Sequence, residues 1–337
     1  MTNFLSLFQS QVQANPNAKA LVYKDLSVSY THLYQLVKQT TSTLKREVNE
    51  GDFIGISAKR GPVSILGVLS ILATGKAYLP LDAKWPLSRL AEIIRNAGIT
   101  TVVCFEAENE FFQKLGLGTL NPSLELGSDN EDVEIGIGNL TYVLHTSGST
   151  GKPKGVVMGT DALTNLIQWQ ATDSYAKVGT HTLQFSPLTF DVSFQEIFAT
   201  LTTGGTLVLA DEEVLHDPQT LIQLLIEQKV NRLFLPFVAL QLLAESALAF
   251  QAIPTDLEEI ITAGEQLKIT DSLVRFFEQL PHCKLVNQYG PTEAHVVSAL
   301  TLTGKPSEWP ALPSIGKAIE GVNLYCVDSE GNVVNSG

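Results

Sequence analysis

The sequence alternates short apolar segments with longer segments of helical periodicity, and this alternation is what most constrains the fold. In the second half of the chain we expect strands at 142–145, 182–185, 206–209, 233–235, 259–262 and 284–287. Segments of helical period separate them, for example 220–228 and 238–250. Such alternation predicts mostly parallel sheets with helices on both faces. Ligands of these sheets gather beyond the carboxyl ends of the strands, so polar loops that follow strands are candidate sites.

The first half of the chain shows the same pattern after a predicted hairpin. Apolar segments at 20–23 and 26–30 flank a two-residue turn, and the spacing of apolar residues predicts a helix at 31–46. Strands are predicted at 53–57 and 101–104. The whole chain is therefore expected to be an α/β protein.

One polar segment interrupts the alternation. Residues 126–138 are acidic and contain glycine, which is typical of a linker. We therefore expect a first α/β subdomain at 1–125 and a second at 139–310, with the candidate ligand loops in the second.

Composition and charge disfavour several classes of function. Of the 337 residues 44% are apolar, which is enough for a large core, and the formal net charge of −13 disfavours binding to nucleic acid or to an anionic membrane. The apolar stretch at 64–78 is interrupted by polar residues, and the N-terminus lacks a signal-peptide pattern, so we expect no membrane association. Cys104, Cys283 and Cys326 show no CxxC spacing, which is typical of a cytoplasmic protein.

A loop rich in glycine and hydroxyl groups follows the predicted strand at 142–145. Residues 146–155 contain three glycines, four hydroxyl side chains and two lysines. Glycines allow backbone N–H groups to converge on one point, and lysines add positive charge, which together suit a polyphosphate. The loop differs from a Walker P-loop, because only two residues separate Gly148 from Gly151 and Pro153 follows the first lysine. A flexible linker is the alternative interpretation.

A second polar cluster follows the predicted strand at 284–287. Gly290 and Pro291 favour a tight turn, which presents the aromatic ring of Tyr289, the hydroxyl of Thr292 and the carboxylate of Glu293. A ring can stack on a base, a hydroxyl can bind a phosphate and a carboxylate can bind Mg²⁺.

Together these segments resemble those of adenylate-forming enzymes, specifically the adenylation domains of nonribosomal peptide synthetases. Residues 146–155 resemble the phosphate loop of that family and residues 287–293 its nucleotide loop. Further segments resemble its other motifs in the family's order, at 28–33, 72–82, 190–196 and 261–266. The resemblance spans nearly the whole chain. It implies the fold of that family, with two packed, mostly parallel α/β subdomains and a small β-rich subdomain.

The resemblance implies a role for each residue of the two loops. The β- and γ-phosphates of ATP would be held by Thr146, Ser147, Gly148, Ser149, Thr150, Gly151, Lys152 and Lys154. Tyr289 would stack on the adenine, and Asn287 and the backbone of Gly264 and Glu265 would meet its edge, with Gly290 as a further ATP-binding residue. Thr292 would contact the α-phosphate and Glu293 would bind Mg²⁺, which makes these two the candidate catalytic residues.

Asp191 is the candidate for recognising the substrate ammonium. A carboxylate among apolar residues is costly to bury without a partner. In the family that this chain resembles, the matching aspartate binds the α-amino group of an amino acid. The alternative is a helix N-cap, formed by Asp191 itself or by Ser193 with Glu196 three residues later.

The resemblance also implies a pocket for the substrate side chain. It would be lined by Asp191, Val192, Gln195, Phe234, Ile261, Ala263, Gln288, Val296 and Val297. Most of these side chains are apolar and none except Asp191 is charged, so we expect a small or medium apolar amino acid. The set resembles proline-selecting pockets, except that Gln288 stands where those often have histidine.

Members of the family continue beyond the segment that residues 311–337 resemble. That segment matches only the start of the β-rich subdomain, and nothing here matches the mobile C-terminal subdomain with its catalytic lysine. The chain alone is therefore expected to be weakly active or inactive. In the intact protein the amino acid would pass to the phosphopantetheine thiol of a peptidyl carrier protein domain, and a condensation domain is a further expected partner.

Two other functions remain open at this stage. One is an acyl- or aryl-acid ligase of the same superfamily, which Asp191 disfavours. The other is a binding module that uses the fold without chemistry, which the loop at 146–155 and Glu293 disfavour.

Overall fold

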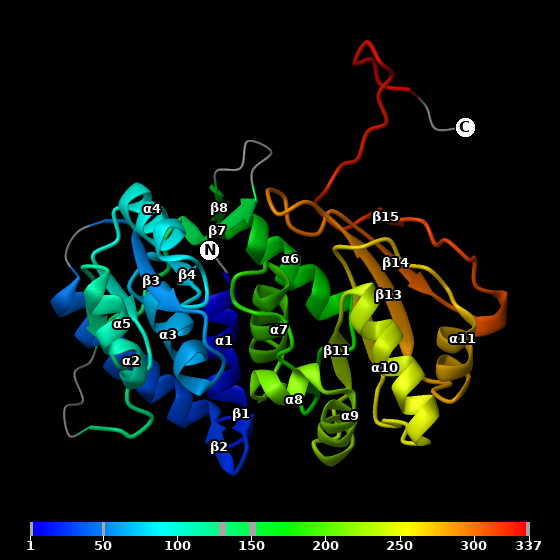
Figure 1. The fold of residues 1–337 in the computed structure, drawn as a ribbon, viewed down its shortest axis with the longest axis horizontal. Coiled ribbons are helices and arrows are strands. Elements are labelled where there is room, and N and C mark those ends of the chain that lie inside the picture. The colour runs from blue at the N-terminus through cyan, green and yellow to red at the C-terminus, as the bar shows by residue number, and fades with distance from the viewer. Residues whose placement is uncertain (1–2, 49–50, 128–132, 148–152, 335–337) are drawn as a thin grey trace.

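The structure, a computed structural model, describes residues 3–48, 51–127, 133–147 and 153–334. Two β-sheets lie side by side, and helices pack against both of them (Figure 1). Most neighbouring strands in each sheet are parallel, which confirms the predicted α/β class. In the part of the chain that is described, no helix combines the length and apolarity needed to cross a bilayer.

One sheet has six strands in the described part of the chain, all of them between residues 53 and 159. Its order is β6 (Gly118–Leu120), β5 (Thr101–Val103), β3 (Phe53–Ser57), β4 (Ala77–Leu81), β7 (Leu140–Ser147) and β8 (Pro153–Gly159). Among the residues that the structure describes, β7 and β8 are its only antiparallel pair.

The other sheet has nine strands within the described residues, and most of the candidate site residues lie in its strands or in the segments that follow them. Its order is β15 (Lys317–Ala318), β14 (Ser298–Leu302), β13 (Lys284–Tyr289), β12 (Glu259–Thr262), β11 (Arg232–Phe234), β9 (His181–Leu183), β10 (Thr206–Leu209), β1 (Lys19–Tyr23) and β2 (Leu26–Ser29). The strands from β1 to β13 in this order are parallel, and antiparallel strands close both edges.

The helices follow the predicted alternation. They are α1 (Phe4–Ala14), α2 (Tyr30–Glu47), α3 (Pro62–Ala73), α4 (Leu87–Ala97), α5 (Asn109–Lys114), α6 (Thr160–Asp173), α7 (Val192–Leu201), α8 (Glu212–His216), α9 (Pro218–Glu227), α10 (Phe237–Phe250) and α11 (Asp271–Glu278). The predicted helix at 31–46 is confirmed as α2, whose buried side chains recur at helical spacing. Pro62 begins α3, where the missing N–H of proline costs no hydrogen bond.

Each sheet contains strands from both sides of the expected linker. β1 pairs in parallel with β10, although these strands are far apart in the sequence, and β7 joins the six-stranded sheet through Tyr78 and Tyr142. The predicted hairpin at 20–30 is confirmed, but it extends the sheet of the second half of the chain. Apolar periodicity indicates where a strand lies and carries no information about its neighbour in the sheet, so the sequence could not predict the pairing of β1 with β10.

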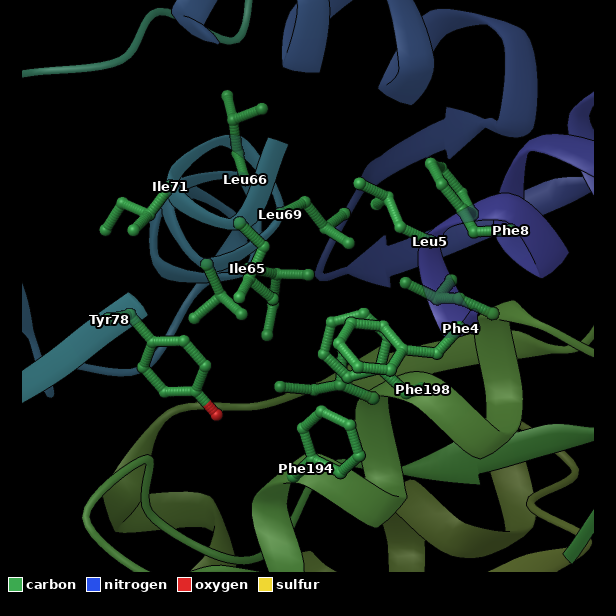
Figure 2. Packing of buried hydrophobic residues seen from close by; sticks show 14 of the residues in the cluster. Phe4, Leu5, Phe8, Ile65, Leu66, Leu69, Ile71, Tyr78, Phe194 and Phe198 are labelled. Atoms are coloured by element: carbon green, nitrogen blue, oxygen red, sulfur yellow. The ribbon is translucent and has the colours of Figure 1, made fainter. Parts of the chain in front are cut away.

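A large apolar core fills the space between the sheets. Phe4 from α1 packs on Phe194 and Phe198 of α7, with ring centroids 5.1 and 4.7 Å away (Figure 2). Ile65 and Leu69 of α3 belong to the same core. These side chains are fully or almost fully buried, so α7 is held firmly against the six-stranded sheet and α1.

Candidate functional site

The predicted site residues of the second half of the chain meet at the carboxyl edge of the nine-stranded sheet. Asp191 lies in the connection from β9 to α7, Gly264 follows β12, and Glu293 lies in the connection from β13 to β14. The strands β9, β11, β12 and β13 are parallel neighbours, so these connections leave the sheet at the same edge. Topology therefore gathers side chains that the sequence separates by about a hundred residues.

The end of β13 separates two groups of candidate residues. Leu285 packs in the core beneath α9, α10 and α11, whereas Val286 packs in a small cluster on the opposite face. Because side chains alternate along a strand, Asn287 lies on the first face and Gln288 on the second. The predicted adenine contacts and the predicted side-chain pocket thus lie on opposite faces of one strand.

The face that carries Gln288 holds a compact apolar cluster. Phe234, Ile261 and Val286 are buried and stand in register on β11, β12 and β13. Val192 from α7 and Ala299 from β14 pack against them. Three predicted pocket residues, Val192, Phe234 and Ile261, are therefore brought together.

Two members of this cluster were missed from the sequence. Val286 lies two residues before Gln288 on the same face of β13, and Ala299 is the cross-strand partner of Gln288. The period of two along a strand would have identified Val286. Ala299 depends on an antiparallel pairing that the sequence did not reveal.

The two glutamines of the predicted pocket, Gln195 and Gln288, are also buried. Gln195 on α7 is fully buried, and its carbonyl oxygen accepts a hydrogen bond from the amide nitrogen of Gln170 on α6, which the sequence analysis missed. Among the described atoms, Gln195 Nε2 and Gln288 Oε1 are buried and have no hydrogen-bond partner. Buried polar atoms of this kind are normally satisfied by a ligand or by water.

The remaining predicted pocket residues lie around this cluster. Ala263 directly follows β12 and is half-buried. Val296 is buried in the large core between the sheets and is not part of the cluster that contains Phe234. Val297 is half-buried, and its N–H donates to the carbonyl of Tyr289 at 2.9 Å, which closes the loop after β13.

Asp191 stands immediately before α7 and does not cap it. Its φ and ψ are −60° and −33°, and among the described residues its side chain accepts no capping hydrogen bond from that helix. The alternative cap is absent too, since the Ser193 hydroxyl donates to the carbonyl of Phe190 at 2.7 Å. Both predictions of an N-cap were therefore wrong, and the half-buried carboxylate of Asp191 has capacity for another partner.

Glu196 holds the loop that leads to Asp191. Its fully buried carboxylate accepts hydrogen bonds from the backbone N–H groups of Phe185 and Ser186 and from the Gln184 side chain. Burial raises the pKa of Glu196 to about 8, while the Ser186 N–H and the nearby Arg60 charge act in the opposite direction. The sequence predicted Glu196 only as part of a cap, although it is the one charged residue of Val192–Leu201, and this was the available signal.

The candidate nucleotide residues lie in and beside the loop after β13. Tyr289 ends the strand and is 48% exposed, and Thr292 and Glu293 follow in a turn. Gly290 is required there, because a Cβ at this position would stand 1.5 Å from the carbonyl oxygen of His295. The loop is therefore tightly folded, and it presents its aromatic ring and carboxylate to solvent.

Other predicted adenine contacts are held in place by neighbouring elements. Asn287 donates its amide nitrogen to the carbonyl of Ser314 at 2.8 Å. Gly264 has a φ of +85° and open space where a Cβ would be, so its backbone is accessible. The Glu265 carboxylate accepts from the N–H of Val238 at 3.1 Å at the start of α10, which fixes this loop to the helix.

The candidate phosphate loop joins β7 to β8. Thr146 and Lys154 are cross-strand partners near the end of this hairpin, and Lys154 is exposed. The predicted residues Gly148, Ser149, Thr150, Gly151 and Lys152 lie outside the described residues, and Ser147 is described only as the last backbone position of β7.

The chain is similar to known proteins in sequence and in structure. The sequence family described as AMP-binding enzyme matches residues 8–337. Gramicidin S synthase 2 of Brevibacillus brevis is 31% identical over 331 residues, and tyrocidine synthase 2 of Brevibacillus parabrevis is 30% identical over 329 residues. Each match covers 96% of this chain, which spans only 7% and 9% of the length of these two relatives.

Solved structures of one protein show the same fold. A crystal structure of the nonribosomal peptide synthetase FmoA3 in an AMPPNP-bound form matches with a TM-score of 0.86 and 26% identity, over 97% of this chain and 36% of that chain. A form of the same protein bound to alpha-methyl-L-serine-AMP matches with a TM-score of 0.87 over 98% of this chain and 37% of that chain.

Proposed function

The chain belongs to the AMP-binding enzyme family, and from this premise we propose that it activates an amino acid as its aminoacyl-AMP. In this reaction a carboxylate oxygen of the amino acid attacks the α-phosphorus of ATP. The bond from the α-phosphorus to the bridging oxygen breaks, and pyrophosphate leaves with the electron pair. Such chemistry depends on positioning and on electrostatic stabilisation, and it needs no protein nucleophile.

The free carboxylate of Asp191 is the observation that carries this proposal. It is half-buried beside α7, forms no cap to that helix among the described residues, and precedes Val192 of the apolar cluster. A substrate ammonium is the natural partner for such a group, because an ion pair offsets the cost of burying the charge. An amino acid bound there would extend its side chain toward Phe234 and Ile261.

The nucleotide would bind on the other side of β13. Tyr289 would stack on adenine, the backbone of Gly264 and Glu265 and the side chain of Asn287 would meet its edge, and Thr292 would contact the α-phosphate. The loop between Thr146 and Lys154 would hold the other two phosphates. This proposal is supported by the exposed ring of Tyr289 and by the open backbone of Gly264. The AMPPNP-bound form of FmoA3 gives independent support.

Glu293 is the residue that would hold a divalent cation. Glu293 is exposed in the turn after Tyr289, so its carboxylate is free to share Mg²⁺ with phosphate oxygens. When bound, Mg²⁺ would offset negative charge on the phosphates during the transfer.

The lining of the pocket favours a small or medium apolar side chain, and proline is the specific candidate. Val192, Phe234, Ile261, Val286 and Ala299 supply apolar surface. The buried amides of Gln195 and Gln288 add neutral polar groups without a charge. An apolar wall with few polar groups selects by shape more than by charge.

The similarity to long synthetases suggests what the product meets next. We propose that the aminoacyl group passes to the phosphopantetheine thiol of a peptidyl carrier protein domain, with a condensation domain as a further partner. The adenylate bound to FmoA3 supports an aminoacyl-AMP intermediate.

Thermal-shift and calorimetric binding of the twenty amino acids, with ATP and Mg²⁺ present, tests the proposal. Wild type should be stabilised selectively by one amino acid, by about 2.7 kcal/mol at a concentration of one hundred times Kd. Asp191→Ala should lose most of this response, because removing one partner of a hydrogen-bonded charge pair costs about 2 kcal/mol or more. ATP binding should persist in the variant.

Asp161→Ala is the matched control, because Asp161 is an exposed aspartate near the start of α6. It should respond to the amino acid as wild type does. A wild-type response to an acyl or aryl acid instead of an amino acid would move the substrate assignment to an acyl- or aryl-acid ligase. Failure to bind ATP would contradict the adenylation function itself.

A further inference from the structure

His295 lies in the loop that carries the candidate nucleotide residues, yet it points to the amino acid side of the site. It follows Glu293 by two residues and is only 4% exposed. Its φ of +56° places it in the left-handed region, which non-glycine residues seldom adopt. Such a conformation persists only where surrounding contacts impose it, and it often marks a functional position.

Two hydrogen bonds fix the imidazole of His295. Its Nδ1 accepts from the N–H of Val296 at 3.0 Å, so the proton of the neutral ring resides on Nε2. That Nε2–H donates to the backbone carbonyl of Asp191 at 3.1 Å. Burial lowers the pKa of His295, which also favours the neutral ring. The ring edge packs near Phe194 on α7, with centroids 6.3 Å apart.

The backbone of the same residue is locked to the nucleotide loop. The carbonyl oxygen of His295 lies so close to Gly290 that no side chain fits there. The N–H of Ala294 donates to the carbonyl of Pro291 at 2.9 Å, which tightens the turn that contains Thr292 and Glu293. Displacement of this loop would therefore move the imidazole, and through it the backbone of Asp191.

We propose that His295 is a positioning residue that couples the nucleotide loop to the ammonium-binding carboxylate of Asp191, so that each substrate strengthens binding of the other. The inference rests on the proposed function. It assigns His295 no contact with either substrate, because its hydrogen bonds go to backbone groups. Coupling between two sites is reciprocal, so nucleotide and amino acid should raise each other's affinity by the same factor, on the order of 5-fold or more.

The test is calorimetric binding of each of the twenty amino acids with and without the α,β-methylene analogue of ATP and Mg²⁺. The methylene group prevents pyrophosphate release, so only binding is measured. Two variants separate the hydrogen bonding of the imidazole from the packing of its ring. His295→Gln keeps a donor for the Asp191 carbonyl and an acceptor for the Val296 N–H, whereas His295→Phe keeps a ring against Phe194 and has neither.

Wild type and His295→Gln should show the coupling, and His295→Phe should lose it while it still binds the analogue alone. His282→Phe is the matched control, because His282 is exposed and precedes β13, at the end of the strand opposite this loop, and it should behave as wild type. Equal coupling in wild type and His295→Phe, or no coupling in wild type, would overturn the inference and leave the proposed function standing. Loss of coupling in both His295 variants would also overturn it, since the hydrogen bonds would then not be the cause. A wild type that binds the analogue but none of the amino acids would defeat the proposed function, and the inference with it.

Discussion

Glu259 of β12 and Glu196 of α7 are both buried, but their carboxyl groups have different surroundings. Glu259 begins β12 and forms an ion pair of 2.8 Å with Arg232, which begins the adjacent strand β11. The Ser174 hydroxyl also donates to Glu259, and the Arg232 guanidinium lies 4.8 Å from the ring centroid of Phe234. At this end of the sheet a carboxylate meets a cation directly and ties two strands together.

Glu196 lies near the carboxyl edge and meets backbone groups instead. The loop of residues 184–186 donates N–H groups to Glu196, and its carbonyl groups accept hydrogen bonds from Arg60. Arg60 belongs to the connection between β3 and α3, so the loop is held from both sheets at once. Five residues after Ser186 the chain reaches Asp191.

The comparison shows how one buried carboxylate stabilises the sheet while another positions a loop of the site. Removing Glu259 should reduce stability without changing the ligand affinity of the folded protein. Removing Glu196 should change ligand affinity as well, because the loop that carries Asp191 loses its anchor.

The largest effect is expected for Glu259→Ala. It leaves the fully buried Arg232 without its counter-charge, and breaking such a pair costs about 3–5 kcal/mol. Urea unfolding should show this loss, and amino acid affinity in the folded protein should stay unchanged. The double variant Arg232→Met with Glu259→Met removes both charges, so it should recover most of the stability. A double variant as unstable as Glu259→Ala would show that packing, and not the unpaired charge, is responsible.

A smaller loss of stability is expected for Glu196→Gln, about 1–3 kcal/mol, because the amide accepts fewer hydrogen bonds from the loop. Amino acid affinity should fall together with stability, and binding of the ATP analogue alone should be affected less. Calorimetry of both ligands on the same preparation measures this difference. Unchanged amino acid affinity would contradict the positioning role of Glu196.

The pH dependence of stability gives a second measure of Glu196. Burial raises its pKa from 4.5 to about 8, so its contribution is fully present below pH 4.5 and is lost as the pH rises through about 8. The lowered pKa of the buried His295 acts in the opposite direction, since stability is lost as the pH falls below its ordinary value of 6.5. The difference between wild type and Glu196→Gln isolates the first effect. Relative to the variant, wild type should lose stability between pH 4.5 and pH 8 in urea unfolding.

The sequence was most informative where a signal is local. The helical period predicted α2, α9 and α10 to within a few residues, and a single proline marked the start of α3. The motifs brought Val192, Phe234 and Ile261 into one predicted pocket, and the structure places them in one cluster.

What the sequence did not indicate depends on contacts between distant segments. The pairing of β1 with β10, the bond from Gln170 to Gln195 and the bond from His295 to Asp191 all join residues that lie far apart in the chain. Glu196 had the local pattern of a capping residue, but the loop after β9 lies within reach of its side chain and uses the carboxylate. Tertiary contacts therefore decided the role of each polar side chain at the site.

The smallest expected effect comes from removing one hydroxyl, either beside the Arg232–Glu259 ion pair or in the segment that carries Asp191. Ser174→Ala deletes a donor to Glu259 and an acceptor for the Arg232 Nε, 2.9 Å away, but it leaves the ion pair in place, so a loss of about 1 kcal/mol is expected. Ser193→Ala deletes the bond to the carbonyl of Phe190, the residue before Asp191, and should cost a similar amount. Urea unfolding should show similar losses of stability in the two variants. Calorimetry should show lower amino acid affinity only in Ser193→Ala, because only this variant loosens the backbone that carries the ammonium-binding carboxylate. Equal losses of amino acid affinity in both variants would mean that the two ends of the sheet are not independent, and that the ion pair at the amino end also positions the site.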